Sequence, residues 1–547
     1  MELRHRLPVI VVGGIASLTV LGFAGTHWLN ADRNVAAEKS LSQPEAIQVY
    51  FNGNQSRGAE FRDPDRGFRR HGDDFEAIVL TQIQQAETEI LLAVQELRLP
   101  RVAEALVAKQ EAGLTVRVVL ENEYHQTIQD AVNTDALTGE SGARLGSYFA
   151  YQDQNQDGVI SEAESDTRDA IAILRRGNVP IVDDTEDGSK GSGLMHHKFM
   201  VVDQKTVLVS STNFTPSGFY GDFDDPDSRG NANNIVVLES KTLAQTFTTE
   251  FNFLWGDGPR GETSSRFGIN KPQRPPTVTT VGDTEVTVKF SPDSQRTDYN
   301  QTSNGLIARF LGQAQDQINL ALFVFSEQAL ADTLDQRFQA GVSVKALIDR
   351  GFAFRSFSEG LDLLGVTRLQ DCEAETNNNP WALPTEFVGV PALPRGDKLH
   401  HKLGIIDDNI VITGSHNWSQ SANISNDETL LVLDNPVIAA HYQREFDHLA
   451  AISDYGPPPA VATDIRTQAR ECAVTPRTPT PLATATPNQL VNLNTADQTA
   501  LESLPGIGPS LAQQIIEGRP YRNLEDLERV NGIGAKTVER LKGKVSW

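Results

Sequence analysis

The feature that most constrains the fold of this chain is a long internal repeat. Residues 89–122 and 317–350 align without a gap, and each reads as a buried strand, an amphipathic helix, a glycine and a second buried strand. This order predicts a βαβ unit whose two strands are parallel. Strand-like stretches at residues 46–52 and 285–291 precede the two copies. We therefore expect an α/β body built from one duplicated unit.

A second pattern repeats behind each βαβ unit. It consists of His-x-Lys, four residues, Asp, six residues, one serine or glycine and a final Ser-x-Asn. Its alternation of apolar and polar positions predicts a strand that carries the histidine and the lysine on one face. The βαβ units are 228 residues apart and these patterns only 204, so the first half holds 24 extra residues. The two copies are His196, Lys198, Asp203, Ser211 and Asn213, and His400, Lys402, Asp407, Ser415 and Asn417.

The doubled pattern resembles the signature of the phospholipase D superfamily, and the resemblance covers about residues 45–451. It implies one central active site that cleaves phosphodiesters without a metal. One histidine attacks phosphorus to form a phosphohistidine, and the other protonates the leaving oxygen and then activates water. The resemblance implies His196 as the nucleophile and His400 as the acid and base. The remaining implied roles are cationic donors to the phosphoryl oxygens (Lys198 and Lys402), neutral donors (Asn213, Asn417, Ser211 and Ser415) and groups that organise the site (Asp203 and Asp407).

The two halves are not chemically identical. Ser210 replaces the motif glycine, Gly414, and a serine is strained wherever φ is positive. Alignment of the following segments places Asn233 opposite Glu428, which matches a family acid that steadies a catalytic imidazole. We therefore expect unequal roles for the two histidines. Which histidine Glu428 supports stays open, as does the alternative that the first half is degenerate.

The extra residues of the first half contain the segment DQNQDGVISEAE, residues 153–164. It matches the calcium-binding loop of an EF-hand, with Gly158 at the turn and Ile160 as an apolar plug. An acidic surface loop without an ion is the alternative. Because the loop is single, we expect a structural Ca²⁺ that takes no part in the phosphoryl chemistry. The expected ligands are Asp153, Asn155, Asp157, Val159 through its carbonyl, Ser161 and Glu164.

The chain after the repeats changes in composition. Residues 455–488 are rich in proline and threonine and predict an extended linker. Residues 490–547 hold two Gly-Ile-Gly turns, each followed by a helical pattern, and resemble the tandem helix-hairpin-helix domain of DNA-uptake receptors. Such turns bring backbone amides at a helix N-terminus to a phosphate without reading sequence. A helical packing or protein-interaction domain is the alternative. The residues implied in DNA contact are Gly506, Ile507, Gly508, Gly532, Ile533, Gly534 and Lys536.

The N-terminus, the net charge and the cysteines indicate in which compartment the protein acts and which partners it can bind. Residues 1–30 join a basic start to an uncharged stretch at 7–24, which predicts a signal peptide or an uncleaved membrane anchor. We expect the body to be exported to the periplasm or the extracellular space. The net charge of −24 argues against a general basic coat for nucleic acid, although it allows a locally basic site. Cys372 and Cys472 are either a disulfide or two unrelated thiols.

These patterns predict a duplicated α/β body with halves at residues 45–260 and 280–452, followed by a small all-α domain. We expect an exported phosphodiesterase that hydrolyses nucleic acid, with DNA held by the C-terminal domain. One alternative is a phospholipase D or phosphatidyltransferase that acts on phospholipid headgroups. Another is a DNA receptor whose body serves only as a scaffold. Both half-sites lie in one chain, which favours a monomer.

Overall fold

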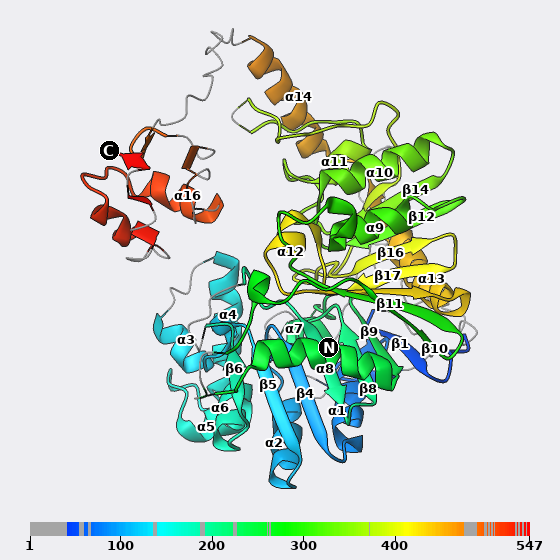
Figure 1. Ribbon diagram of the computed structural model, residues 1–547, viewed down its shortest axis with the longest axis vertical. Helices are drawn as coiled ribbons and strands as arrows, with labels where there is room; N and C mark the ends of the chain where they lie inside the picture. The colour runs from blue at the N-terminus through cyan, green and yellow to red at the C-terminus, as the bar shows by residue number, and fades with distance from the viewer. Residues whose placement is uncertain are drawn as a thin grey trace, which may run out of the picture. The chain divides into compact units, whose positions relative to one another are not determined.

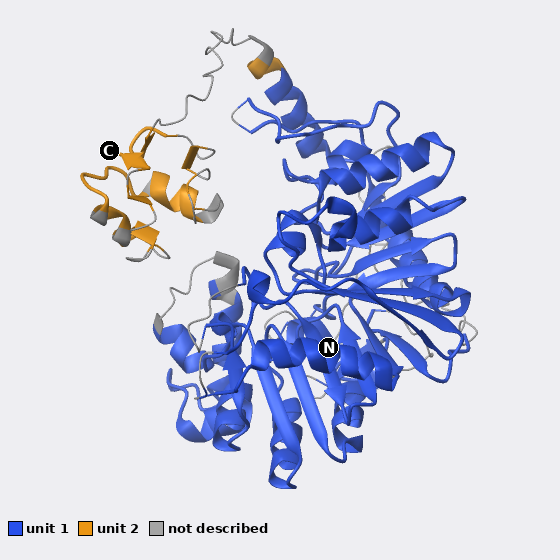
Figure 2. Cartoon of the chain, viewed as in Figure 1, with its two compact units in different colours: residues 1–469 blue, residues 470–547 orange. Residues whose placement is uncertain are grey.

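A computed structural model describes the body and parts of the C-terminal domain. The contacts divide the chain into two compact units, residues 1–469 and 470–547, which we treat separately (Figure 2). The predicted signal or anchor at residues 1–30 lies outside the described residues, and among those described no helix has the length and apolar character to cross a bilayer. The described residues are 41–53, 60–63, 67–134, 139–185, 192–222, 227–259, 261, 264–370, 372–474, 490–496, 500–501, 504, 507, 509–530, 533, 537–538, 541–542 and 544–547.

The first half folds around a seven-stranded mixed sheet with the order β1-β9-β8-β7-β4-β5-β6 (Figure 1). β4 (Glu89–Val94) and β5 (Thr115–Leu120) are parallel and are joined by α2 (Pro100–Glu111), which confirms the predicted βαβ unit. Pro100 suits the first turn of α2, where its missing N–H leaves no helical bond unmade. The other strands are β1 (Ile47–Phe51), β6 (Ile181–Asp183), β7 (Lys198–Val202), β8 (Thr206–Ser210) and β9 (Asn234–Glu239).

The second half repeats this architecture in a nine-stranded sheet. Its order is β10-β11-β19-β17-β16-β12-β14-β15-β20, so the strands from β11 to β15 match those of the first sheet one by one. β12 (Gln317–Leu322), α10 (Gln328–Gln339) and β14 (Ser343–Ile348) form the second βαβ unit. The remaining strands of the sheet are β10 (Thr277–Val281), β11 (Thr284–Phe290), β15 (Val388–Pro391), β16 (Lys402–Ile406), β17 (Ile410–Gly414), β19 (Thr429–Asp434) and β20 (Ser453–Tyr455).

Side chains that alternate along each strand divide between two cores. In β4, Ile90 and Leu92 pack on the outer face with α1 (Phe75–Gln85), α2 and α6 (Ala170–Arg176). Leu91 and Ala93 face an inner core that also contains side chains of α8 (Lys241–Trp255) and α13 (Pro436–Ala451). The outer face of the second sheet packs on α9 (Ser303–Leu311), α10 and α11 (Glu359–Leu363). Because the inner core draws on both halves, the body has one continuous centre.

The insertion of the first half lies between β5 and β6. It contains α3 (Ile128–Thr134), α4 (Gly139–Gln152), α5 (Glu162–Arg168) and α6. The predicted calcium loop joins α4 to α5, and Gly158 has the positive φ of 83° that the turn requires. Ile160 packs with Ile128 and Tyr148 in a small core of its own, which holds the loop on the insertion.

The expectation of an extended linker over residues 455–488 is wrong for its first part. Helix α14 runs over Pro459–Val474, and its Val461 and Ile465 pack against the outer core of the second half. Such tertiary contacts outweigh local composition. The rest of the predicted linker, 475–489, lies outside the described residues. Both Cys372 and Cys472 are disulfide-bonded, which selects the disulfide from the two alternatives.

The C-terminal unit has a small apolar core. β21 (Val491–Asn492) and β22 (Val545–Ser546) pair in parallel beside α16 (Pro509–Glu517). Ile507 and Ile533 are 4% and 3% exposed, so their side chains fill this core and only their backbone can face a ligand. The other predicted DNA contacts, Gly506, Gly508, Gly532, Gly534 and Lys536, lie outside the described residues.

Candidate active site

Each His-x-Lys segment is held by the opposite half of the body. The backbone N–H of His196 donates to the carbonyl of Asp427 at 3.0 Å. The backbone N–H of His400 donates to the carbonyl of Ala232, also at 3.0 Å. Asp427 and Ala232 occupy matching positions just before β19 and β9. This exchange of backbone bonds brings both histidines into one site.

The two imidazoles are likewise oriented across the halves. Nδ1 of His196 lies 2.7 Å from Oε2 of Glu428, and Nδ1 of His400 lies 3.0 Å from Oδ1 of Asn233. Both acceptors draw the ring hydrogen to Nδ1, so Nε2 is the atom left for chemistry. The structure therefore places a carboxylate behind His196 and a neutral amide behind His400.

The motif serines support these acceptors. Oγ of Ser415 donates to Oε2 of Glu428 at 2.7 Å, and Oγ of Ser211 donates to Oδ1 of Asn233 at 2.8 Å. We expected the two hydroxyls to donate to the phosphoryl group. A hydroxyl has one proton to give, and here that proton is used to orient the acceptor behind each histidine.

The two lysines are fully buried. Nζ of each donates to the backbone carbonyl of the histidine two residues earlier, at 2.8 Å. Lys198 also donates to Gln95 at 3.3 Å, whereas Nζ of Lys402 lies 5.0 Å from the ring centre of Phe323. Burial lowers the pKa of Lys198 to about 7, and burial together with Lys198 lowers the pKa of Lys402. Because ammonium groups are poorly solvated there, a bound phosphate gains strongly from them.

The same surroundings keep both imidazoles neutral. Burial, followed by the charges of Lys198 and Lys402, lowers the pKa of His196 well below its ordinary value. Burial and the same two lysines also lower the pKa of His400. A neutral His196 has a lone pair on Nε2 and can attack phosphorus. A bound phosphate adds negative charge, which raises the pKa of His400 toward that of a proton donor.

The amide oxygens of the motif asparagines accept no hydrogen bond from the part of the chain that the structure describes. Oδ1 of Asn213 and Oδ1 of Asn417 are buried, and neither has a hydrogen-bond partner among the described residues. A buried amide oxygen without a donor at the same place in both halves leaves the orientation of each amide to be set by a ligand. Their NH₂ groups are suited to the predicted contacts with phosphoryl oxygens.

The motif aspartates lie at the far ends of their strands. Asp203 accepts hydrogen bonds from the backbone N–H groups of Glu87, Thr88 and Glu89, at 2.7–3.0 Å. Asp407 makes the same contacts with residues 315–317. Burial alone would raise the pKa of Asp203, but these bonds hold it below its usual value. The aspartates tie the strands of the two motifs to β4 and β12 and do not contact the histidines.

The motif glycine is required in the second half alone. Gly414 has a φ of 118°, and a Cβ there would lie 2.3 Å from the carbonyl oxygen of Thr429. Ser210 is not among the residues with positive φ and ends β8 in strand conformation. The strain expected for this serine is therefore absent, because the first half adopts a different local backbone.

The predicted calcium loop, residues 153–164, is rich in side-chain oxygens. Oδ2 of Asp153 accepts from the backbone N–H of Gly158 at 2.9 Å, and Oδ1 of Asn155 accepts from that of Asp157 at 2.9 Å. Glu164 accepts from backbone groups at both ends of the loop. The hydroxyl and backbone N–H of Ser161 are the main groups that lower the pKa of Glu164 to about 2, so it is ionised. Carboxylate and amide oxygens on one loop fit the ligand preference of Ca²⁺.

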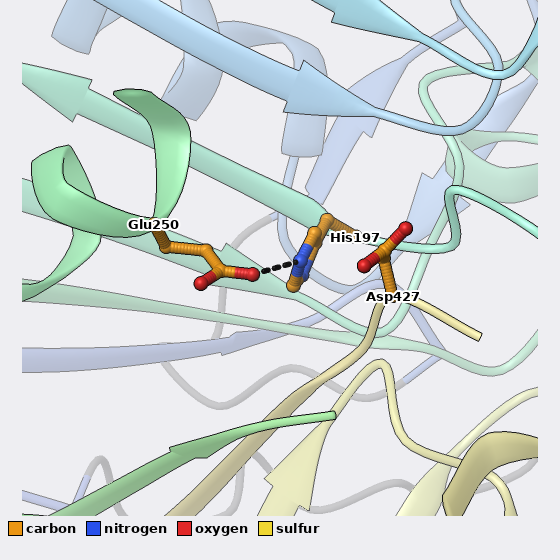
Figure 3. Close-up of side chains that lie close together, drawn as sticks. All are labelled: His197, Glu250 and Asp427. Carbon is orange, nitrogen blue, oxygen red and sulfur yellow. Dashed lines mark hydrogen bonds and ion pairs between the residues drawn. The ribbon is translucent and has the colours of Figure 1, made fainter. Parts of the chain in front are cut away.

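The residue after His196 belongs to a buried cluster that the sequence did not predict. His197, Glu250 and Asp427 gather there, and Nε2 of His197 lies 3.0 Å from Oε1 of Glu250 (Figure 3). Nζ of Lys271 lies 2.5 Å from a carboxylate oxygen of Glu250 and of Asp427, so an ammonium occupies the place of a metal ion. The second half repeats the pair as His401 and Glu445 at 3.1 Å. The signal was the second histidine of each "HHK".

Both the body and the C-terminal segment resemble known proteins. A family model described as "Cardiolipin synthase, PLD-like domain" matches residues 79–255 and 307–450, and a "Helix-hairpin-helix motif" model matches residues 486–546. The mitochondrial cardiolipin hydrolase of Xenopus laevis is 30% identical over 144 residues, which are 26% of this chain and 59% of the relative. ComE operon protein 1 of Bacillus subtilis (strain 168) is 39% identical over 61 residues, which are 10% of this chain and 30% of the relative.

The aligned regions thus cover less than two thirds of the length of these relatives. A phosphatidylserine synthase structure from Haemophilus influenzae Rd KW20 superposes with a TM-score of 0.45 and 14% identity. That alignment covers 79% of this chain and 95% of the synthase.

Proposed function

Because this chain belongs to the phospholipase D-like family described by the cardiolipin synthase model, we propose that it is a phosphodiesterase that works through a phosphohistidine. The observation that carries the proposal is the crossed pairing of His196 with Glu428 and of His400 with Asn233. It supplies two neutral imidazoles with different partners in one site, beside two buried lysines. With these groups, one histidine can attack phosphorus and the other can protonate the leaving oxygen on the opposite side.

The proposed reaction has two displacements. As the substrate phosphate binds, His400 takes up a proton from solvent on Nε2. Nε2 of His196 then attacks phosphorus while the bond to the leaving oxygen breaks, and His400 gives that oxygen its proton. Water then attacks the phosphohistidine, His400 takes the proton of the water, and the P–N bond breaks. Glu428 stabilises the positive charge on His196 in the intermediate, and the lysines stabilise charge on the phosphoryl oxygens.

For the substrate we propose nucleic acid, cleaved outside the cytoplasm by a monomer. The helix-hairpin-helix match at residues 486–546 supports this choice, because backbone amides at such turns suit a phosphate chain of any sequence. The C-terminal unit would hold DNA while the body cleaves it. The second candidate is hydrolysis or transfer at phospholipid headgroups, which the name of the matching family and the cardiolipin hydrolase relatives favour.

We also propose that residues 153–164 bind a structural Ca²⁺. Asp153, Asn155, Asp157, Ser161 and Glu164 would supply side-chain oxygens, and Val159 its carbonyl. The ion would stiffen the insertion between α4 and α5. It would take no part in the chemistry, which the buried lysines already support with positive charge.

The test of the proposed function uses the purified full-length chain on plasmid DNA and on vesicles of phosphatidylcholine and cardiolipin. His196→Ala and His400→Ala are assayed beside it. We expect cleavage of DNA that either substitution removes. Hydrolysis of lipid with no cleavage of DNA would favour the second candidate, and full DNA cleavage by both variants would contradict the assignment of the site.

A further inference from the structure

A row of aromatic rings leads from His400 to the protein surface. The ring of Phe323 lies 4.7 Å from the ring of His400, and the ring of Phe352 lies 4.7 Å from Phe323. Phe357 follows at 6.5 Å from Phe352 and is 38% exposed. Two of these rings belong to the segment between β14 and α11, residues 350–357, which we name the platform loop.

The platform loop is fixed to the catalytic segment by a single carboxylate. Oδ2 of Asp349 accepts from the backbone N–H of Leu399, the residue before His400, at 2.9 Å. Oδ1 of the same side chain accepts from the backbone N–H of Gly351 at 2.8 Å. The loop therefore keeps one position relative to His400, as a binding surface next to a reaction centre must.

The platform loop is also basic. Its sequence is RGFAFRSF, and both Arg350 and Arg355 are exposed. The corresponding loop of the first half, residues 122–129, contains no arginine and carries the exposed Glu123, although its Tyr124 matches Phe352. Gln95 stands there in place of Phe323. The two arginines therefore make the loop on the His400 side the more positive of the two, which favours a polyanion there.

Arginines interleaved with exposed rings suit an unpaired polynucleotide. Bases have flat π-faces that stack on aromatic side chains, and the arginines match the phosphates between them. Bases of a duplex already stack on one another and pair, so they offer no free face to a protein ring. A lipid headgroup has phosphate but no such face.

We infer that the platform loop stacks an unpaired nucleobase of the leaving strand, so that the site prefers single-stranded nucleic acid. The inference rests on the proposed nuclease function and names its substrate class. His400 would protonate the leaving oxygen, and the first base beyond that oxygen would lie on Phe352 and Phe357. Arg350 and Arg355 would contact the following phosphates.

The test compares kcat/KM of the full-length chain on three DNA substrates of equal length: a single strand, its duplex, and a strand whose nucleosides are replaced by abasic tetrahydrofuran residues. The variants are Phe352→Leu, Phe352→Tyr and Phe357→Ala. Leucine keeps apolar bulk without a π-face, tyrosine keeps the face, and Phe357 is exposed enough to be removed without loss of folding. Phe387→Ala is the matched control, because Phe387 is 49% exposed in the same half but packs on Tyr455.

We expect Phe352→Leu and Phe357→Ala to lower kcat/KM on the single strand by about tenfold and on the abasic strand by less than about twofold. Phe387→Ala should stay close to the wild type on all three, and Phe352→Tyr should keep the wild-type ratio of kcat/KM between the normal and the abasic strand. If Phe352→Leu and Phe357→Ala lose kcat/KM equally on the normal and abasic strands, or lose it on neither, the platform is overturned. Cleavage of DNA by the wild type would still support the proposed function in that case. Hydrolysis of the phosphatidylcholine and cardiolipin vesicles used to test the proposed function, with no cleavage of DNA, would overturn both.

Discussion

Glu428 of the second half accepts a hydrogen bond from Nδ1 of His196 in the first half, at 2.7 Å. The matching group of the first half is Asn233, which serves His400 of the second half at 3.0 Å. Each half therefore supplies a histidine and the acceptor for the other histidine, and neither half is a complete site. The chemical difference between carboxylate and amide assigns the roles, because only the carboxylate stabilises a positive charge on the imidazole it holds.

Glu428→Gln should lower kcat by about a hundredfold with little change in KM, because the charge of the phosphohistidine loses its counter-ion in a buried site. Single-turnover kinetics on a DNA substrate measure this directly. Glu445→Gln is the matched control, since Glu445 is an equally buried carboxylate that holds the non-catalytic His401. A loss of kcat as large in Glu445→Gln would show that the effect of Glu428 is structural.

The pH dependence of kcat/KM should reflect two lowered pKa values in the free enzyme. His196 acts as a neutral base, and its pKa lies below the ordinary 6.5, so activity persists as the pH falls below 6.5. Lys198 acts as a cation with a pKa of about 7, so kcat/KM should decline as the pH rises through about 7 and the charge is lost.

Lys198→Arg tests whether loss of the charge on Lys198 causes the alkaline decline of kcat/KM. Arginine stays charged at every accessible pH, so kcat/KM of the variant should fall less steeply as the pH rises through about 7, even where its absolute rate is lower. Wild-type kcat/KM that stays constant up to about pH 9 would contradict the role of Lys198.

Asp203→Asn and Asp407→Asn should each lower the free energy of unfolding by about 1 kcal/mol, because an amide accepts the backbone N–H groups less well than a half-exposed carboxylate. Activity well below the melting temperature should remain. The pKa of Asp203 is lowered on folding, so its contribution is present above the unfolded pKa and is lost as the pH falls through the folded value. Urea unfolding of the variants at neutral and acidic pH measures both effects. Loss of turnover at unchanged stability would instead place these aspartates in the chemistry.

Added Ca²⁺ should raise the melting temperature of the full-length chain. At a hundredfold excess over its dissociation constant, the ion should add about 2.7 kcal/mol to the free energy of unfolding. Asp153→Ala should remove the shift, while Asp166→Ala, an acidic change on the neighbouring α5, should leave it intact. Initial rates of DNA cleavage should be the same with a chelator. An immediate and reversible loss of turnover with the chelator would contradict a purely structural ion.

The repeat at residues 89–122 and 317–350 was sufficient to predict the two βαβ units. The apolar periods of strand and helix are local properties of each segment and do not depend on how the halves pack. The pairing of Glu428 with His196 could not be predicted, since it depends on how the halves pack against each other. The ring contact of Phe323 with His400 lies within the second half, but it joins residues 77 positions apart and depends on the pairing of β12 with β16. Helix α14 was missed because the packing of Val461 and Ile465 outweighs the composition of the segment around them.

The most direct test of the two-histidine mechanism is to trap the intermediate on the full-length chain with thymidine 5′-(4-nitrophenyl phosphate). Its nitrophenolate leaves without a proton, so His400→Ala should carry out the first displacement and stop before hydrolysis. The mechanism predicts a burst of about one nitrophenolate per chain and a thymidylyl group on His196, located by mass spectrometry, with neither in His196→Ala. A nucleotide found on His400, or a burst that persists in His196→Ala, would contradict it.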